Sequence, residues 1–187
     1  MIESMIRQSI AVKEHFLADE ACMAGLRQCI ELAIVALKQG GTLFFAGNGG
    51  SYTDCQHIVG EFVGRLITER PPLSAVALGM NGASLTAIGN DYGYEQVFAR
   101  ELQALGRSGD VFFPLSTSGN SRNLLAAIPV AQTAGMSVVG WTGATGGKMA
   151  ELVPCIKVPS GCTMRIQECH IMMGHLLCAA IDRALHP

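Results

Sequence analysis

The sequence from residue 42 to residue 65 reads TLFFAGNGGSYTDCQHIVGEFVGR, and the rest of the chain is best understood from it. The mostly apolar run 42–46 has the length of a buried strand and ends at Gly47. The GNGGS segment that follows predicts a turn in which the backbone can approach a ligand closely. We expect Ser51 to cap a helix that follows it. A glycine turn between a strand and a helix is typical of a ligand site at the carboxyl end of a parallel strand.

The predicted helix has one apolar stripe and one polar stripe, and the polar one contains Asp54, His57, Glu61 and Arg65. His57 and Glu61 are four residues apart and therefore neighbours on one helix face. Such a pair, taken alone, is usually a solvated surface. Its position just after a glycine-rich turn favours chemistry instead. Gly60 and Gly64 each weaken the helix by about 1 kcal/mol relative to alanine, so we expect a closely packed backbone or ligand beside them.

The composition limits the class of protein. The 187 residues are 49% hydrophobic and only 15% charged, against roughly 25% charged in typical soluble domains. No apolar run approaches the roughly 20 residues that span a bilayer, which argues against a membrane protein. We therefore expect one domain whose apolar excess is buried between subunits of an oligomer. The net charge of −2, with no Lys/Arg cluster, argues against a nucleic-acid partner.

The cysteines indicate a reducing compartment. They are odd in number, lack CxxC spacing and lie mostly in apolar segments: Cys22, Cys29, Cys55, Cys155, Cys162, Cys169 and Cys178. This pattern is typical of reduced core thiols. The N-terminal residues alternate charged and apolar side chains and show no secretory signal. We expect a cytoplasmic protein.

Short apolar runs alternate with helical patterns along the chain, which predicts a doubly wound α/β fold with a five-stranded parallel sheet. The expected strands are 42–46, 73–78, 110–115, 137–141 and 155–158. The expected helices are 2–18, 21–39, the one after Ser51, 83–89, 94–106 with Val97, Leu102 and Leu105 in the core, one ending near 134, and 163–184. We expect turns at 90–93 and at Gly146-Gly147.

The second candidate site is the hydroxyl-rich loop Ser116-Thr117-Ser118-Gly119-Asn120-Ser121, between a strand and a helix. Free backbone N–H groups, the helix dipole and several hydroxyls favour a phosphate. The same residues would also serve as several capping side chains at a helix N-terminus. The loop alone does not favour the phosphate site over this alternative. The loop lacks a lysine and GxxxxGK[ST] spacing, which argues against a nucleoside triphosphate.

The final helix is apolar nearly all round, so we expect it to be buried, most plausibly at a subunit interface. Gln167 and His175 lie about 80° apart around it and must find polar partners there. A core histidine bonded to a backbone carbonyl is the common alternative for His175. We expect His170 and Glu168 to be interface or surface residues.

Five strings together resemble one family: AGNGGSYTDCQHIVGEFVGR, NDYGYEQVFAR, STSGNS, TGATGGKMAE and RIQECHIMMGH. They are similar to those of the sedoheptulose 7-phosphate isomerases (phosphoheptose isomerases) of the sugar isomerase (SIS) fold, over nearly the whole chain. STSGNS alone is shared by many sugar-phosphate binders of this fold. HxxxE after GNGGS, combined with RIQE and a histidine eight residues past the glutamine, is more specific.

The resemblance implies a single SIS domain over residues 1–187, a three-layer sandwich with a five-stranded parallel sheet. It implies a homotetramer with active sites between subunits, to which helices 2–39 and 163–184 contribute packing. The implied reaction converts D-sedoheptulose 7-phosphate to D-glycero-D-manno-heptose 7-phosphate through an enediol, the first step toward activated heptoses for lipopolysaccharide, capsule or related pathways.

The resemblance also implies roles for residues that match the family's motifs. The implied sugar-binding residues are Asn48, Gly49, Gly50, Ser51, Glu61, Asn90, Asp91 and Gln167. The implied phosphate-binding residues are Ser116, Thr117, Ser118 and Ser121. The implied Zn²⁺ ligands are His57, Glu61, Gln167 and His175.

Glu61 is the expected base for carbon-proton transfer, because a carboxylate removed from bulk water becomes more basic. His175 is expected to shuttle protons to the oxygens. A zinc ion would act as a Lewis acid on the carbonyl, although a zinc-bound glutamate is a weaker base and an amide is a modest ligand. Similar chains carry an aspartate directly before RIQE, where this chain has Met164 with the arginine of RIQE next to it, a difference that bears on substrate preference.

Two readings from other classes remain. One is a non-catalytic sugar-phosphate sensor, and the other is an adaptor for a replication initiator. Proteins of this fold that associate with replication initiators keep GNG-S, STxGNS and RIQE but lack HxxxE and the late histidine. The presence of His57, Glu61 and His175 here favours the enzyme.

Overall fold

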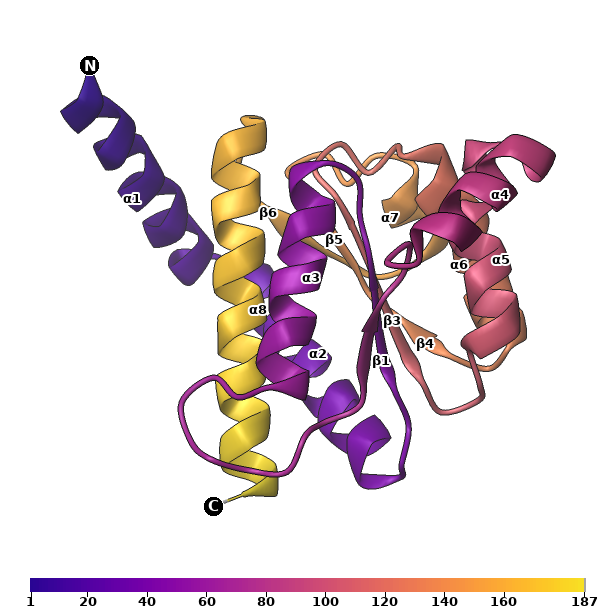
Figure 1. Ribbon diagram of the computed structural model, residues 1–187. Helices are drawn as coiled ribbons and strands as arrows, with labels where there is room; N and C mark the ends of the chain where they lie inside the picture. The colour runs from indigo at the N-terminus through magenta and orange to yellow at the C-terminus, as the bar shows by residue number, and fades with distance from the viewer. Residues whose placement is uncertain (187) are drawn as a thin grey trace.

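The computed structural model describes residues 1–186, which form an α/β fold (Figure 1). The helices are α1 (Ile2–Ala18), α2 (Glu20–Lys38), α3 (Gly50–Val63), α4 (Gly82–Tyr92), the 3₁₀ turn η1 (Tyr94–Gln96), α5 (Val97–Leu105), α6 (Arg122–Thr133), α7 (Met149–Leu152) and α8 (Thr163–Leu185). The strands are β1 (Leu43–Ala46), β2 (Ala75–Ala77), β3 (Val111–Ser116), β4 (Ser137–Val138), β5 (Gly140–Gly143) and β6 (Cys155–Val158).

The strands form one parallel sheet in the order β2-β1-β3-β5-β6, with β4 also paired to β3. The strand expected at 137–141 is interrupted at Val139. Its first half pairs with Val111 and Phe112, and its second half pairs with Leu115 and Ser116 further along β3. The six strand segments therefore occupy five positions in the sheet, as the sequence predicts.

The order of the strands fixes where a ligand can bind. From β1 the chain crosses to β2 on one side and then returns to β3 on the other. At such a switch point the loops that leave the carboxyl ends of the two strands diverge and open a crevice. The two candidate loops, at residues 47–51 and 116–121, follow β1 and β3 directly. They therefore lie at the same edge of the sheet.

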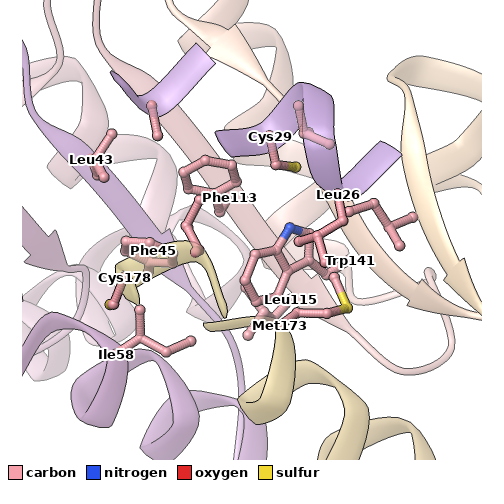
Figure 2. Packing of buried hydrophobic residues seen from close by; sticks show 14 of the residues in the cluster. Leu26, Cys29, Leu43, Phe45, Ile58, Phe113, Leu115, Trp141, Met173 and Cys178 are labelled. Atoms are coloured by element: carbon pink, nitrogen blue, oxygen red, sulfur yellow. The ribbon is translucent and has the colours of Figure 1, made fainter. Parts of the chain in front are cut away.

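Helices cover both faces of the sheet. In Figure 1, α2, α3 and α8 lie on one face and α5 and α6 on the other. Because the side chains of a strand alternate, Phe45 belongs to the first core and Phe44 to the second. Phe45, Phe113 and Trp141 pack side by side across three neighbouring strands in the first core (Figure 2), with the first two rings stacked at a centroid distance of 5.0 Å and Trp141 tilted 5.8 Å from Phe113. The almost fully buried strands explain the continuous apolar runs of the sequence.

Several local predictions are wrong. The helix expected at 83–89 extends from Gly82 to Tyr92, with Asn81 capping it, so Asn90 and Asp91 are helical rather than in a turn. Leu105 is 49% exposed at the end of α5, although we expected it in the core. The short helix α7, just after Gly146-Gly147, was not expected.

Two helices leave apolar side chains in solvent. Of α1 only Phe16 is buried, while Ile6 is 56% and Ile10 49% exposed, and Figure 1 shows α1 projecting from the body. On α8, Leu176 is 45% exposed, so this helix is not buried on every side in one chain. The described helices contain no segment with the length and apolarity needed to cross a membrane.

Candidate functional site

Three of the four predicted metal ligands meet in space. His57 Nε2 lies 3.0 Å from His175 Nε2 and 3.2 Å from Glu61 Oε1. One ligand atom from each of the three residues lies within 4.8 Å of the other two. The His57 side chain is half exposed and that of Glu61 is 23% exposed, so the cluster is open to a ligand while its carboxylate is largely withdrawn from water.

The packing of α3 against α8 creates this cluster. The two helices lie side by side in Figure 1. Gly174 permits the contact, because a Cβ on it would lie 2.4 Å from Ile58 Cγ1. At the start of α3, a Cβ on Gly50 would lie 2.5 Å from Gln167 Nε2. Glycine at 174 therefore lets α8 approach closely enough to place His175 beside His57, and glycine at 50 leaves room for the end of the Gln167 side chain.

A buried arginine holds the far end of the same helix pair. Arg70 donates to the carbonyl oxygens of Glu61 and Phe62, both at 2.8 Å, where α3 ends. Its Nε lies 2.5 Å from Asp182 Oδ1 on α8. The Arg70 side chain is fully buried. It satisfies carbonyls that the helix leaves unpaired and joins α3 to α8.

The three donors fit a metal ion. Tetrahedral zinc with bonds of about 2.0–2.1 Å holds neighbouring ligand atoms roughly 3.3 Å apart. The distances of 3.0 Å and 3.2 Å in the cluster are close to that value. Two imidazoles and a carboxylate are donors that zinc accepts. The described residues thus contain a possible metal site of His57, Glu61 and His175. Gln167 contacts Gly50 in the first turn of α3, and its role as a fourth ligand stays a prediction.

The loop after β3 has the features of an anion site. Ser116 is buried, and its hydroxyl lies 2.9 Å from that of Ser121. Ser121 is the N-cap residue of α6 but makes no side-chain capping bond there. The alternative of a helix start capped by this serine is therefore not what the structure shows. Gly119 has φ +67°, and a Cβ there would lie 1.9 Å from Gly146 O, so only glycine fits this turn.

Asn48, in the loop after β1, is bonded to two residues that sequence reasoning missed. Its amide exchanges two hydrogen bonds with Asn123 of α6, at 2.8 Å and 3.0 Å. The hydroxyl of Tyr94 donates to Asn48 Oδ1 at 3.0 Å. Nothing in the local sequence marks Asn123 or Tyr94 as partners of Asn48, because the three belong to separate elements. Asn90 and Asp91 are exposed in the last turn of α4, with Asn90 donating to Asp91.

Two predictions about the site helices are wrong. Ser51 does not cap α3, because the helix begins at Gly50 and Gly49 is its N-cap residue, with φ +54°. His170 is not at the surface but fully buried, with Nε2 3.4 Å from Thr142 O. Burial lowers the pKa of His170 to about 4, so the ring is neutral. It is His170, not His175, that lies in the core beside a backbone carbonyl.

Three other residues lie on the two site helices, α3 and α8. Asp54 lies one turn before His57 on α3, and burial raises the pKa of its carboxyl group to about 6. Glu168 accepts one hydrogen bond from Ser9, which ties α1 to α8, and one from Arg165 of its own helix. Burial raises the pKa of the Glu168 carboxyl group, but these bonds outweigh it, so the pKa is lowered. Met164, directly before the RIQE string, is 51% exposed in the first turn of α8.

The fold and the site define the class of protein. Residues 6–143 match the family model described as "SIS domain". The chain belongs to the SIS-domain family.

Comparisons with individual proteins narrow the family. The chain is 51% identical to the phosphoheptose isomerase of Aneurinibacillus thermoaerophilus, over 98% of this chain and 93% of the relative. It is 48% identical to phosphoheptose isomerase 2 of Campylobacter jejuni, over 98% and 92%. A solved phosphoheptose isomerase from Neisseria gonorrhoeae superposes with a TM-score of 0.91 at 38% identity, covering 97% of both chains. Within the SIS-domain family, this chain is a member of the phosphoheptose isomerases.

Proposed function

We propose that the protein is an aldose–ketose isomerase that converts D-sedoheptulose 7-phosphate to D-glycero-D-manno-heptose 7-phosphate. Full-length relatives named phosphoheptose isomerase, at about half identity, support this activity. The observation that carries the proposal is the convergence of His57, Glu61 and His175 at one point. A protein that only binds a sugar phosphate has no need of a base and a proton shuttle beside its ligand.

The reaction moves one proton between neighbouring carbons while the two oxygens exchange roles. Glu61 removes a proton from C-1 of the ketose, which gives an enediol, and returns a proton to C-2. His175 protonates O-2 and accepts the proton from O-1, so that the aldehyde forms at C-1. Each residue ends the cycle in its starting state.

The metal assignment extends the three-donor cluster by one amide. His57, Glu61, Gln167 and His175 would hold Zn²⁺, which when bound supplies a Lewis acid for the sugar carbonyl. A carboxylate has two oxygens, so Glu61 can offer one to a cation and keep the other for the proton. Chelation followed by metal analysis tests this clause: we expect activity to fall with zinc content. Full activity in zinc-free protein would show that the reaction does not need the metal.

The two loops at the switch point would hold the rest of the substrate. Ser116, Thr117, Ser118 and Ser121 would bind the phosphate through hydroxyls and the amide groups at the start of α6. Asn48, Gly49, Gly50, Ser51, Asn90, Asp91, Glu61 and Gln167 would line the sugar. Ser121 makes no side-chain capping bond at the start of α6, which supports this orientation.

We further propose that the protein works as a homotetramer in the cytoplasm, with each active site completed at a subunit interface. The apolar side chains that α1 and α8 expose, among them Ile6, Ile10 and Leu176, support burial against other copies. Seven cysteines that form no disulfide support a reducing compartment. Sedimentation or light scattering tests the tetramer.

The activity is tested by incubating the purified protein with D-sedoheptulose 7-phosphate and recording proton NMR spectra. We expect anomeric signals of an aldose to grow at a rate proportional to enzyme concentration. Fructose 6-phosphate is the control substrate: its conversion at a comparable rate would indicate that the protein isomerises a different phosphosugar. Saturable binding of the heptulose phosphate without any aldose would instead favour a non-catalytic sensor.

A further inference from the structure

The hydrogen bonds around Asn48 fix which way its amide points. The backbone N–H of Leu124, which can only donate, bonds to Asn123 Oδ1 at 3.0 Å. Asn123 must therefore turn its Nδ2 toward Asn48, where it donates to Asn48 Oδ1 at 2.8 Å. Asn123 is 3% exposed, so water does not compete for this arrangement.

The orientation of Asn48 has a consequence for a ligand. Its Oδ1 accepts from both Asn123 Nδ2 and the Tyr94 hydroxyl, which uses both lone pairs. One N–H of its Nδ2 donates to Asn123 Oδ1 at 3.0 Å. The other N–H of Asn48 has no hydrogen-bond partner among the described residues 1–186, so it is available to a ligand. Toward a ligand, Asn48 is thus a donor and not an acceptor.

Tyr94 supplies the complementary group. Asn48 Oδ1 carries no hydrogen, so in this bond the tyrosine hydroxyl must donate its only proton. The phenolic oxygen then has lone pairs free and acts as an acceptor. Tyr94 is 58% exposed, so its oxygen is reachable from outside the core. A free N–H and a free acceptor oxygen lie on two residues that are bonded to each other.

We propose that Tyr94 is a substrate-binding residue, and that Tyr94 and Asn48, held by Asn123, recognise one hydroxyl group of the sugar chain. A hydroxyl both donates and accepts, so it matches this pair, whereas a ketone or an ether oxygen can only accept. The inference rests on the proposed function, because it assumes that a sugar phosphate occupies the crevice between the two loops.

The position of the pair indicates which hydroxyl is recognised. Asn123 lies two residues after Ser121 of the proposed phosphate loop. His57 and Glu61, where C-1 and C-2 would react, lie further along the helix that Asn48 precedes. A hydroxyl in the middle of the chain or toward its phosphate end, at C-4, C-5 or C-6, therefore fits better than one beside the reacting carbons.

The test compares Tyr94→Phe with Tyr92→Phe. Tyr94→Phe removes one hydroxyl from an exposed ring and should fold normally. Tyr92, whose ring lies 3.8 Å from Arg100 Cζ, gives a matched loss of a hydroxyl outside the network. We expect Tyr94→Phe to raise KM and Kd for D-sedoheptulose 7-phosphate by about 3- to 10-fold, the usual range for one hydrogen bond, with a smaller change in kcat. Tyr92→Phe should match the wild type.

A second arm identifies the hydroxyl with the 4-, 5- and 6-deoxy analogues of sedoheptulose 7-phosphate. For one analogue, the wild type should bind the deoxy compound more weakly than D-sedoheptulose 7-phosphate, whereas Tyr94→Phe should bind the two almost equally. The reason is that the variant already lacks the interaction that the missing hydroxyl would make. Equal losses for both proteins with every analogue, or a KM and Kd unchanged in Tyr94→Phe, would overturn the inference while leaving the isomerase activity intact. If the wild type binds the sugar phosphate without turnover, the proposed function is refuted. The ratio of the Kd of Tyr94→Phe to that of the wild type would still decide the role of Tyr94.

Discussion

His175 and Asp182 lie seven residues apart on α8, and both reach toward the helix that carries the other half of the site. His175 Nε2 is 3.0 Å from His57 Nε2 on α3, and Asp182 Oδ1 is 2.5 Å from Nε of Arg70, which binds the last carbonyls of α3. Two turns of helix therefore link the reactive cluster to a buried ion pair. The ion pair fixes one end of the helix contact that places His175.

Removal of this arginine should destabilise the fold strongly. Arg70→Met leaves Asp182 charged and buried without its partner, which typically costs about 3–5 kcal/mol. We expect a loss of that size in the free energy of unfolding measured with urea. Arg70→Met combined with Asp182→Leu should lose less, because no charge is stranded.

Arg122→Met is the matched control for that experiment. It breaks an ion pair with Glu95 in which the two side chains are 81% and 55% exposed. Exposed pairs contribute about 0–1 kcal/mol, so this variant should remain close to the wild type. Equal stability losses in Arg70→Met and Arg122→Met would show that the buried pair does not hold the helices.

His175→Gln should lower turnover by orders of magnitude while leaving the fold intact. The side chain is only partly buried at the edge of the α3–α8 contact, and glutamine can fill similar space. Loss of a positioned proton shuttle typically lowers the rate by about 10²–10⁴-fold. The measurement is kcat for D-sedoheptulose 7-phosphate together with circular dichroism and oligomer size. A well-folded variant with normal kcat would reject the role given to His175.

The buried His170 predicts how stability depends on pH. Its pKa is near 6.5 in the unfolded chain, and burial lowers it to about 4 in the folded protein. Between these values the unfolded chain binds a proton that the folded chain does not, so the free energy of unfolding falls as the pH drops from about 6.5 to about 4. Below that, this group contributes no further change. In His170→Gln the fall should be shallower over the same range, as measured by urea unfolding at a series of pH values. Parallel profiles for the two proteins would contradict the buried, neutral state.

The sequence was sufficient for the order of the main strands and helices and for the two loops. Short apolar runs that end in glycine or serine predict buried parallel strands with ligand loops at their carboxyl ends, and β1 and β3 have this form. The interruption at Val139 was not predictable, because it depends on where two short segments pair along β3.

The faces of α8 could not be distinguished from sequence for a physical reason. The helix is apolar nearly all round, so periodicity does not tell which of its two histidines faces the sheet. His170 packs toward Trp141 and Thr142 in the core, and His175 faces α3. The partners of Asn48 were missed because Tyr94 and Asn123 reach it only through the tertiary fold.

The account depends most on Glu61 as the group that moves the carbon-bound proton. The direct measurement is conversion of D-sedoheptulose 7-phosphate in D₂O by the wild type and by Glu61→Gln, followed by NMR. Glutamine keeps the size of the side chain but cannot accept the proton. We predict that the wild type forms the aldose with solvent deuterium at C-2 and that Glu61→Gln forms none. Aldose formation by Glu61→Gln at the wild-type rate would contradict the account.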